Sequence, residues 1–501
     1  MCCIFSSLLT PHSSLSAAAL TLLSAVLLGG CQPAERYGPR PASETFAKKQ
    51  TETDAPKKTD NEPLDPEIQW IEVVDPPGPD VPIEFVHADK EEWAKLPIFW
   101  NASPLTEAGR AGAVVGMPPL TAGAIAGSSM GVIKIKVPLG LPDPSAYVPA
   151  DNPLTLGKWK LGQRLFFDDT WLESKAGTSC ASCHQPDHGF ADDERRHDGF
   201  NTPTLVNCVF NRWQFWDGRA GRLEEVVQRT LEDERESNAS KPFRHTWSGV
   251  IHRLRDKPVY HEPFNAVFGK PIAEKEDKEQ SNITQDTVGR ALACYLRTIL
   301  AGDSIHDRAL REQTRKHDSA LKAEHYEAVL DDAALAELGR AKAKKADVAV
   351  ELLRGYRLFN GRDDSRPLMN CYRCHSGQTF RDDKFHNLGV GYLSRPGQEG
   401  GRFAQVPIGQ KDSYLIDAYK TPTLRNLLRT DPYFHDGSNK SLREVVEFYN
   451  LVAGRNSHLD PELRGKDGRT RLLDLSAAEI EAVVLFLRAL NGGDMDSSLK
   501  P

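Results

Sequence analysis

Apolar residues recur with the spacing of an α-helix in two long segments of the chain. In the first, they lie four, seven, eight and eleven residues after the starting position and share one helical face: Val288, Leu292, Tyr295, Leu296 and Ile299. The second begins with Ser476 and Glu479, which form a capping box, and ends at Asn491-Gly492. Its apolar positions are Ile480, Val483, Val484 and Leu487. The pattern predicts a mainly α-helical protein with a long helix near the C-terminus.

The first third of the chain lacks this helical pattern. Residues from Gln32 to about Pro82 are rich in Lys, Asp, Glu, Thr and Pro, a composition that cannot bury enough apolar surface to offset the entropy of ordering. Residues 101–145 are rich in Gly, Ala and Pro, and Val132 to Val137 alternate like a short strand. We therefore interpret residues 31–137 as a low-complexity tether followed by an extension without an assigned role.

Residues 1–30 have the pattern of an export signal. They contain no Lys, Arg, Asp or Glu, and Leu15 to Leu28 form a largely apolar stretch that is too short to span a bilayer as an ordinary helix. Leu28-Gly29-Gly30-Cys31 resembles a bacterial lipobox, in which Cys31 becomes the lipid-modified first residue. A lipoprotein signal is the first interpretation and plain secretion the alternative. Both predict a periplasmic protein, and the first adds a lipid anchor at Cys31 as its only attachment to the membrane.

Length and charge narrow the class of protein. A chain of 501 residues with 39% hydrophobic residues is long enough for two ordinary domains. The 63 basic and 70 acidic side chains give a net charge of −7, without a long basic run. Nucleic acid is therefore not an expected partner, and a small redox protein is a better candidate partner for a chain of this charge.

Two copies of the motif Cys-x-x-Cys-His carry the most specific chemistry. They are Cys180-Ala-Ser-Cys183-His184 in the first half of the chain and Cys371-Tyr-Arg-Cys374-His375 in the second half. In each, two thiols are spaced to form thioethers with one haem, and the histidine is placed to ligate its iron. A zinc site is the competing interpretation, but its cysteine pairs usually lie about 15–20 residues apart, much closer than these. The motifs predict two covalently bound haem c groups.

The two cysteines downstream of the signal and outside these motifs lie in apolar runs. Cys208 is flanked by Leu-Val-Asn and Val-Phe, and Cys294 by Ala-Leu-Ala and Tyr-Leu. Because free cysteine often behaves as a small buried hydrophobe, we predict two buried thiols in preference to a disulfide.

An internal repeat relates the regions that follow the two motifs. Three blocks recur with identical spacing of thirteen and then eight residues. Thr202-Pro-Thr-Leu-Val-Asn207, Phe215-Trp-Asp-Gly218 and Leu223-Glu-Glu-Val-Val227 correspond to Thr421-Pro-Thr-Leu-Arg-Asn426, Phe434-His-Asp-Gly437 and Leu442-Arg-Glu-Val-Val446. This ungapped match predicts two duplicated cytochrome c-like haem domains. We place the N-terminal haem c domain at residues 138–340 and the C-terminal one at residues 341–501.

Two haems in one chain favour peroxide chemistry. A haem that only passes electrons needs two axial ligands, whereas one that reduces a peroxide needs an open position. Cleavage of hydrogen peroxide consumes two electrons, and a second haem can hold the second oxidising equivalent.

The sequence around the motifs resembles the bacterial dihaem cytochrome c peroxidases and their relative MauG over about residues 138–492. The similar segments are Leu161-Gly-Gln-Arg-Leu-Phe-Phe-Asp168, Asn201-Thr-Pro-Thr, Gln214-Phe-Trp-Asp-Gly-Arg219, Ala301-Gly-Asp-Ser304, Thr421-Pro-Thr-Leu-Arg-Asn and Pro432-Tyr-Phe-His-Asp-Gly. The resemblance implies a dihaem oxidoreductase. The site residues given next follow from it.

In the family, the helix after His-Asp-Gly carries the distal ligand of the C-terminal haem, Met in the peroxidases and Tyr in MauG. The matching position here is Tyr449, and no Met lies between His375 and the end of this helix. Ser441 and Glu444 form a capping box at the start of the helix. A phenolate ligand favours ferric and higher-valent iron. A core tyrosine with a satisfied hydroxyl is the alternative.

The resemblance also assigns residues between and beside the haems. Trp216 matches the tryptophan between the two haems, and Glu236 matches the acid/base for peroxide cleavage, within an acidic run whose alternative role is a solvated surface. A calcium ion is implied at Asn201, Thr430 and Pro432, because calcium prefers amide and carbonyl oxygens.

Two features depart from the peroxidase pattern. Val226 stands where the family has a glutamine, and the segment from His184 to Asn201 is shorter than the loop that supplies a detachable histidine. His188 and His197 lie at other offsets, so both are interpreted as surface histidines and the N-terminal iron as five-coordinate.

The first interpretation is an exported dihaem peroxidase that reduces hydrogen peroxide with electrons from a small donor protein, a cytochrome c or a cupredoxin. Tyr449 and the short loop also favour MauG-like oxidation of a protein substrate through bis-oxidised haem. A non-enzymatic electron-transfer cytochrome with two six-coordinate haems is the third alternative.

Overall fold

The structure is a computed structural model. It describes residues 68–69, 81–87, 99–102, 132–172, 178–192, 200–232, 247–269, 281–363, 370–391, 400–451, 458–464, 473–493 and 499–500. These residues all belong to one compact unit, Pro63–Pro501. The predicted export signal, Cys31, His197 and Glu236 lie outside the described residues.

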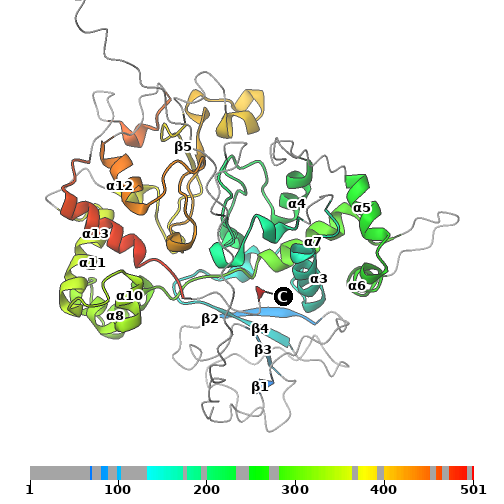
Figure 1. Ribbon diagram of the computed structural model, residues 1–501, viewed down its shortest axis with the longest axis horizontal. Coiled ribbons are helices and arrows are strands. Elements are labelled where there is room, and N and C mark those ends of the chain that lie inside the picture. Colours follow the sequence, from blue (N-terminus) through cyan, green and yellow to red (C-terminus); the bar gives the residue numbers. More distant parts are fainter. Residues whose placement is uncertain are drawn as a thin grey trace, which may run out of the picture. The chain divides into compact units, whose positions relative to one another are not determined.

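Helices predominate among the described residues (Figure 1). The first group, here called the N-terminal module, comprises α3 (Leu156–Phe167), α4 (Leu223–Glu232), α5 (Trp247–Arg255), α6 (Pro258–Phe268) and α7 (Gln285–Leu296). The second group, the C-terminal module, comprises α8 (Ile305–Arg315), α9 (Ala323–Val329), α10 (Asp332–Glu337), α11 (Lys345–Phe359), α12 (Leu442–Leu451) and α13 (Ala477–Arg488). The mainly α-helical prediction is confirmed.

Both long helices expected from the apolar pattern are present. The first is α7, which begins with Thr284 as its N-cap and buries the predicted apolar face. The second is α13, where the Ser476 N–H and hydroxyl both bond to the Glu479 carboxylate at 2.9 and 2.7 Å. At α12 the capping box forms only in part. The Glu444 N–H donates to the Ser441 hydroxyl at 3.2 Å, but the Glu444 carboxylate accepts from the Lys440 N–H.

Each module is built around one close helix crossing. Helix α3 packs on α7, and α11 packs on α13 (Figure 1). A Cβ atom on Gly162 of α3 would lie 2.0 Å from the Ala291 carbonyl oxygen, and one on Gly355 of α11 would lie 2.0 Å from that of Ala482. No side chain fits at these distances, so glycine is required where each pair of helices crosses.

The chain segment that joins α3 to α7 and the segment that joins α11 to α13 have corresponding local geometry. Helices α4 and α12 are both ten residues long and begin at Leu223 and Leu442, which are equivalent positions of the sequence repeat. At another equivalent pair of positions, Phe215 and Phe434 both have positive φ, 63° and 67°. Backbone conformation therefore follows the sequence repeat.

The cores show which elements belong together. Helices α3 and α7 share a hydrophobic core with α4, α5 and α6. Helices α8 to α10 instead pack with α11 and the end of α13, through Ile305, Leu335, Leu352 and Leu485. The packed core of the C-terminal module thus includes residues on the N-terminal side of the expected domain boundary at 340.

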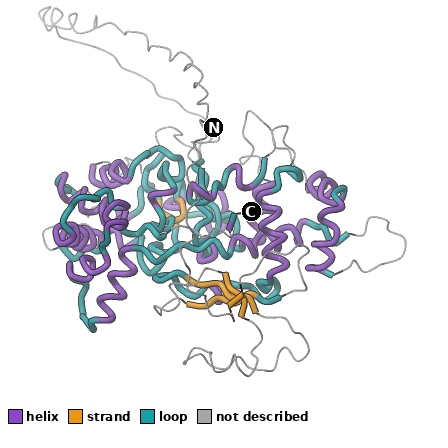
Figure 2. The backbone as a smooth tube through the Cα atoms, turned by 60° about the horizontal axis from the view of Figure 1, so that its bottom comes forward, coloured by secondary structure: helices purple, strands orange, loops and turns teal. Residues whose placement is uncertain are grey.

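A four-stranded sheet in the order β1-β3-β4-β2 precedes the helices (Figure 2). Its strands are β1 (Ile68–Gln69), β2 (Ile83–His87), β3 (Phe99–Ala102) and β4 (Val132–Val137). Strand β4 is the strand predicted by alternation, and it pairs parallel to β2 and antiparallel to β3. The Ile83 N–H donates to the Leu154 carbonyl at 3.1 Å, which ties the sheet to the approach to α3.

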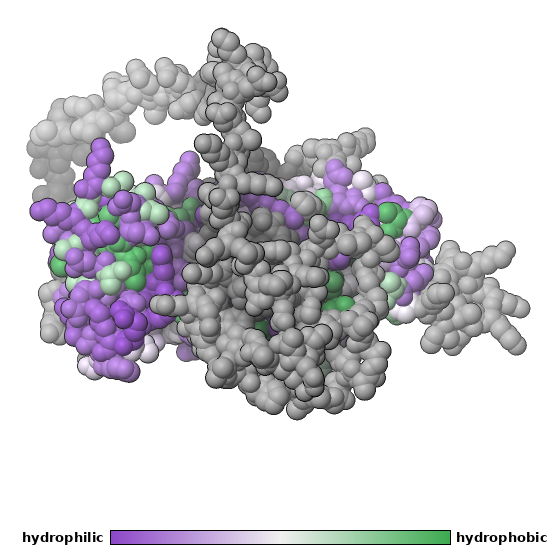
Figure 3. Space-filling model, turned by 90° about the horizontal axis from the view of Figure 1, so that it is seen from below, coloured by the Kyte–Doolittle hydropathy of each residue, from purple (hydrophilic) through white to green (hydrophobic). Residues whose placement is uncertain are grey.

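The described residues include no helix that could span a membrane. None of their helices combines the length and the apolar composition needed to cross a bilayer. In the view of Figure 3, hydrophilic residues prevail over the part of the described surface that is visible. Among the described residues, the exposed large apolar side chains are Tyr147, Val259, Val350, Tyr372, Ile408 and Tyr414.

Candidate active site

The two Cys-x-x-Cys-His motifs adopt the same conformation. Each begins with a single 3-10 turn, Cys180–Ser182 or Cys371–Arg373. The N–H of His184 donates to the Cys180 carbonyl, and the N–H of His375 to the Cys371 carbonyl, both at 2.9 Å. The histidine in each motif is thus held one turn after the first cysteine.

The side chains of both motif histidines are oriented by a backbone carbonyl. Nδ1 of His184 lies 3.0 Å from the Phe190 oxygen, and Nδ1 of His375 lies 3.0 Å from the Phe380 oxygen. Since a carbonyl only accepts, Nδ1 carries the hydrogen and Nε2 the lone pair. Burial lowers the pKa of His375 to about 4, which keeps this imidazole neutral. A neutral imidazole with Nε2 unprotonated is the form that ligates a metal.

Each motif lines its own cavity of about 250 Å³. Cys371, Cys374 and His375 line the C-terminal cavity, and Cys180, Cys183 and His184 line the N-terminal cavity. Apolar side chains supply much of both linings, among them Phe359, Leu388, Val445 and Leu487 in the first and Phe166, Trp171, Val227 and Leu292 in the second.

The cysteines fit haem attachment and do not fit a shared zinc site. All four motif cysteines are free, and each pair lines a different cavity. Burial raises the pKa of Cys180 and of Cys371 to about 12, so both thiols are neutral before any group binds to them. Two neutral thiols and one oriented imidazole beside an apolar cavity are the groups that a haem c requires.

The other two cysteines are buried free thiols, as predicted. Cys208 donates weakly to the Leu296 carbonyl at 3.5 Å, and Cys294 lies 3.8 Å from the Asn152 side-chain oxygen. Burial raises the pKa of Cys208 to about 12 and that of Cys294 to about 11. Neither thiol is therefore activated for chemistry.

One wall separates the two cavities and belongs to both modules. The residues that line both cavities are Asn201, Thr202, Thr204, Trp216, Lys420, Pro422 and Thr423. Trp216 is held at both ends within this wall. Its indole N–H donates to the Asn201 carbonyl at 2.8 Å, and its own carbonyl accepts from the Lys420 N–H at 2.7 Å. The structure therefore places Trp216 in the wall between the two cavities.

Helix α12 brings Tyr449 to the lining of the C-terminal cavity. The Tyr449 ring packs against Phe434 and Phe448, with centroids 6.2 and 5.6 Å away. Burial, together with the nearby Cys374 and Cys371, raises the pKa of its phenol above the usual value. Without a cation in the cavity, Tyr449 is therefore neutral.

The corresponding position of α4 carries Thr230, which lines the N-terminal cavity. Its hydroxyl donates to the Val226 carbonyl of its own helix at 2.8 Å. The two cavities thus differ at one equivalent position, with a phenol in the C-terminal cavity and a short hydroxyl in the N-terminal one. Val226, the departure noted in the sequence, also lines the N-terminal cavity.

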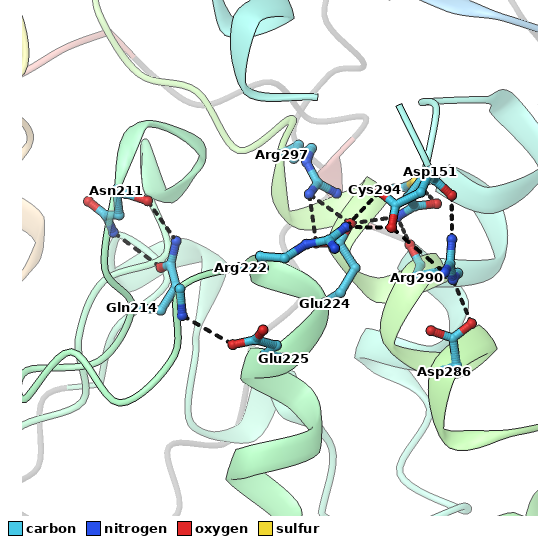
Figure 4. A network of polar contacts seen from close by, with 12 residues as sticks. Asp151, Asn211, Gln214, Arg222, Glu224, Glu225, Asp286, Arg290, Cys294 and Arg297 are labelled. Atoms are coloured by element: carbon cyan, nitrogen blue, oxygen red, sulfur yellow. Dashed lines mark hydrogen bonds and ion pairs between the residues drawn. The ribbon is translucent and has the colours of Figure 1, made fainter. Parts of the chain in front are cut away.

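Helix α4 is fixed by a buried ion pair to Arg297, the C-cap residue of α7 (Figure 4). The Arg297 guanidinium contacts both oxygens of Glu224 at 2.8 and 2.9 Å, and the Asn152 amide donates to the same carboxylate at 2.8 Å. Both side chains of the pair are buried. This network sets the position of Val226 and Thr230 on the cavity wall. The equivalent of Glu224 on α12 is Arg443, which is half-exposed.

The three residues implied for calcium lie along the C-terminal cavity. The Asn201 amide nitrogen contacts the Pro432 carbonyl and lies 3.2 Å from that of Phe434. The Asn201 side-chain oxygen is buried and has no hydrogen-bond partner among the described residues. As placed, the amide nitrogen faces these two carbonyls, so a calcium ion there would require the amide to turn over and present its oxygen beside them.

The interpretation of His188 as a surface residue is wrong. It is half-buried, and its Nε2 lies 2.7 Å from the carbonyl of Asp431, a residue of the other module. His188 is absent from the N-terminal cavity lining and instead joins the two modules.

Sequence reasoning also missed a charged cluster in the C-terminal cavity. His386 lies between Asp382, 2.9 Å from its Nε2, and Asp460, 2.7 Å from its Nδ1. Although burial opposes the charge, the two carboxylates raise the pKa of His386 to about 12. Asp382 and His386 are close in the sequence, but Asp460 is distant, so no local motif marks the cluster.

Comparison with known proteins places the chain in a family. The family model for di-haem cytochrome c peroxidase matches residues 157–315. The methylamine utilization protein MauG of Methylorubrum extorquens is 30% identical over 366 residues, which cover 71% of this chain and 83% of that protein. The chain belongs to the dihaem cytochrome c peroxidase and MauG family.

A second relative of this dihaem peroxidase is the cytochrome-c peroxidase IdrP1 of Denitromonas iodatirespirans, 29% identical over 71% of this chain and 86% of that protein. Among solved structures, a MauG-like protein associated with microbial copper homeostasis matches with a TM-score of 0.50 and 24% identity. The match covers 72% of this chain and 95% of that structure and shows a shared fold. The chain is thus a peroxidase-type oxidoreductase, and its family implies two haem c groups.

Proposed function

We propose that this protein is an exported dihaem peroxidase that reduces hydrogen peroxide to water with electrons from a small redox protein. The observation that carries the proposal is the pair of cavities, each lined by one Cys-x-x-Cys-His motif, on either side of the wall that holds Trp216. The equivalent positions on α4 and α12 support the view that the two haem domains arose by duplication.

The residues of each motif would hold one haem. Cys180 and Cys183 would bind the first through thioethers and His184 would ligate its iron, while the equivalent residues of the C-terminal motif would bind the second. When bound, haem iron supplies the one-electron redox chemistry that a peroxide requires. The protein would contribute covalent attachment, a ligating imidazole for each haem and apolar cavity linings that limit the access of water.

Tyr449 is the proposed distal ligand of the C-terminal haem iron. Its place on the lining of the same cavity as His375 supports this role, and the absence of Met from the described part of that lining agrees with it. Binding to iron would remove the phenol proton that burial otherwise retains. Thr230 at the equivalent position is too short and already bonded, which suits an N-terminal site open to peroxide.

Glu236 is the proposed acid/base at the N-terminal cavity. Reduction of hydrogen peroxide requires a proton to leave the oxygen that binds and a proton to reach the oxygen that departs. One carboxylate can serve both steps by accepting the first proton and returning it to the departing oxygen. Two electrons from the donor protein and two further protons complete the reduction to two waters.

We also propose a calcium ion at the interface of the modules. The Asn201 side-chain oxygen and the backbone oxygens of Thr430 and Pro432 would bind it. The orphaned Asn201 oxygen supports this site, because a bound cation would satisfy it.

MauG-like oxidation of a protein substrate is the second candidate function. Tyr449, in place of the methionine of the peroxidases, favours it because a phenolate stabilises oxidised iron. Trp216 would then link the two sites that share the oxidising equivalents. A donor assay and a protein-oxidation assay on the same enzyme distinguish the two functions.

For either function, we place the mature protein in the periplasm, with Cys31 as the site of a lipid anchor. Its redox partner there would be a cytochrome c, a cupredoxin or an oxidisable protein substrate. Labelling of the expressed protein with a radioactive fatty acid, with Cys31→Ser as control, tests the anchor.

Haem loading and turnover test the function together. Wild-type protein should carry two covalent haems and oxidise a reduced cytochrome c or cupredoxin when hydrogen peroxide is added. Cys180→Ala and Cys371→Ala should each lose one covalently bound haem, because each breaks one attachment motif. Haem-stained denaturing gels and mass spectrometry measure the loading. Two covalent haems in either variant, or no peroxide-dependent oxidation of any donor or protein, would contradict the proposal.

Replacement of Tyr449 with Phe should change only the C-terminal haem. Loss of the phenol oxygen removes a distal ligand, so the low-spin ferric signal of this haem should convert to high spin in the EPR spectrum. The N-terminal haem signal should stay as in the wild type. Tyr414→Phe, at an exposed tyrosine of the same module, is the matched control. An unchanged spectrum of Tyr449→Phe would show that another group ligates this iron.

A further inference from the structure

Lys420 is the one basic residue that lines both cavities within the described ranges. It ends strand β6 (Tyr419–Lys420), which pairs with β5 (Phe385–His386). Its backbone N–H is the donor to Trp216 described above. Only 9% of Lys420 is exposed to solvent. A lysine therefore stands within the wall, where long basic side chains are rarely found.

The Lys420 ammonium has neither an ion-pair partner nor a hydrogen-bond acceptor among the described residues. Burial, followed by the charge of Arg381, lowers the pKa of Lys420 to about 7. Asp383 acts in the opposite direction, but it is ion-paired with Arg381 at 3.5 Å. A buried ammonium without a counter-charge is costly, so this position calls for an anion from outside the polypeptide.

The internal repeat gives Lys420 a counterpart. In the register of the repeat, Lys420 corresponds to Asn201, and Trp216 corresponds to His435. The Lys420 N–H donates to the Trp216 carbonyl at 2.7 Å, and the Asn201 N–H donates to the His435 carbonyl at 2.6 Å. The modules thus meet through a reciprocal pair of contacts, as in an interface between two like subunits. Lys420 lies at the centre of this interface, where both cavities can be reached.

We propose that the Lys420 ammonium is a carboxylate-binding site shared by the two cavities and that it binds a propionate group of each haem. The proposal rests on the placement of one haem in each cavity. A haem c carries two propionates, and these carboxylates are its anionic groups, whereas the positions that form thioethers with the cysteines are uncharged. Lys420 would therefore orient the propionate edge of both haems toward the wall that contains Trp216.

The shared charge has a consequence for both reduction potentials. Ferric haem carries one more positive charge than ferrous haem, so a nearby ammonium disfavours the ferric form and raises the potential. Low exposure keeps solvent from screening this effect. Removal of one lysine should thus lower two potentials at once, an effect that a residue of one cavity alone would not produce.

The test compares the purified two-haem proteins Lys420→Met, Lys420→Gln and Lys420→Arg with the wild type by spectroelectrochemical titration of both haems. Lys420→Met and Lys420→Gln should lower both midpoint potentials, and Lys420→Arg should keep them close to the wild-type values. Lys440→Met, at an exposed lysine of the same module, should leave both unchanged. Haem counting by mass spectrometry precedes each titration. Fewer than two haems in the wild type would refute the proposed function itself, independently of Lys420.

The possible outcomes distinguish a requirement for the positive charge of Lys420 from a requirement for the shape of its side chain. Unchanged potentials in Lys420→Met would overturn the proposal, and so would a shift confined to one haem, because the site would not be shared. If both neutral variants fail to load two haems while Lys420→Arg loads normally, the requirement for a positive charge supports the proposal. Failure of all three variants to load would assign the requirement to side-chain shape and overturn it.

Discussion

Glu236→Gln is expected to slow peroxide-driven oxidation by about 10²–10⁴, the range typical of a lost general acid/base. An amide can neither accept the proton from the peroxide nor return it to the departing oxygen. Since the cysteines and histidines of the two motifs are the groups proposed to hold the haems, the resting visible and EPR spectra should match the wild type. Stopped-flow measurement of oxidation at saturating donor gives the rate of the affected step.

Two further variants test whether the loss of activity is specific to Glu236. Glu262→Gln changes an exposed glutamate of α6 in the same way and should leave the rate unaltered. Glu234→Gln tests the neighbouring acidic position. If Glu234→Gln is inactive and Glu236→Gln is normal, the acid/base role moves by two residues. Normal rates in both variants would show that this acidic run is a solvated surface without a catalytic part.

Arg425→Met is expected to reduce the free energy of unfolding by about 3–5 kcal/mol, because it leaves a buried carboxylate without its partner. The Arg425 guanidinium contacts both oxygens of Asp307 on α8, at 2.7 and 2.9 Å. It also donates to the carbonyls of Gly140 and Gln378, each at 2.7 Å. Both side chains of the pair are 1–2% exposed. Unfolding in guanidinium chloride, followed by circular dichroism, measures the change in the free energy of unfolding.

The matched control is Arg443→Met. Arg443 forms ion pairs with Glu447 and Glu481, but its side chain is 44% exposed. Exposed pairs contribute little because water screens them and competes for the same groups. The midpoint of unfolding should therefore stay close to the wild-type value. Equal losses in the two variants would show that burial does not govern the energetics of the Arg425 pair.

The same pair should make stability depend on pH. Burial alone would raise the pKa of Asp307, but Arg425 and Ser304 outweigh it, so the pKa lies below the usual value. A carboxyl whose pKa is lowered in the folded state stabilises the protein above its unfolded pKa of about 3.9. This contribution is lost as the pH falls through the folded pKa. In Arg425→Met, the acid side of the stability profile should be flatter.

Sequence alone was sufficient where the decisive contacts are local. The spacing within Cys371-Tyr-Arg-Cys374-His375 places two thiols and an imidazole on one turn, and the structure forms that turn in both motifs. Helix α7 follows from apolar periodicity alone, and α13 follows from apolar periodicity together with the capping box at its start. The ungapped repeat also identified the elements that would correspond, since α4 and α12 begin at equivalent positions, Leu223 and Leu442.

Only the tertiary structure decided which residues of the two modules meet. His188 forms a hydrogen bond with the Asp431 carbonyl, and Lys420 lines both cavities. No local sequence pattern around either residue predicts these contacts. The exposure of a charged side chain depends on which surfaces pack over it, and those surfaces come from distant segments of the other module. Spacing in the chain therefore determined the chemistry of each haem motif, whereas packing between the modules determined the wall that the two cavities share.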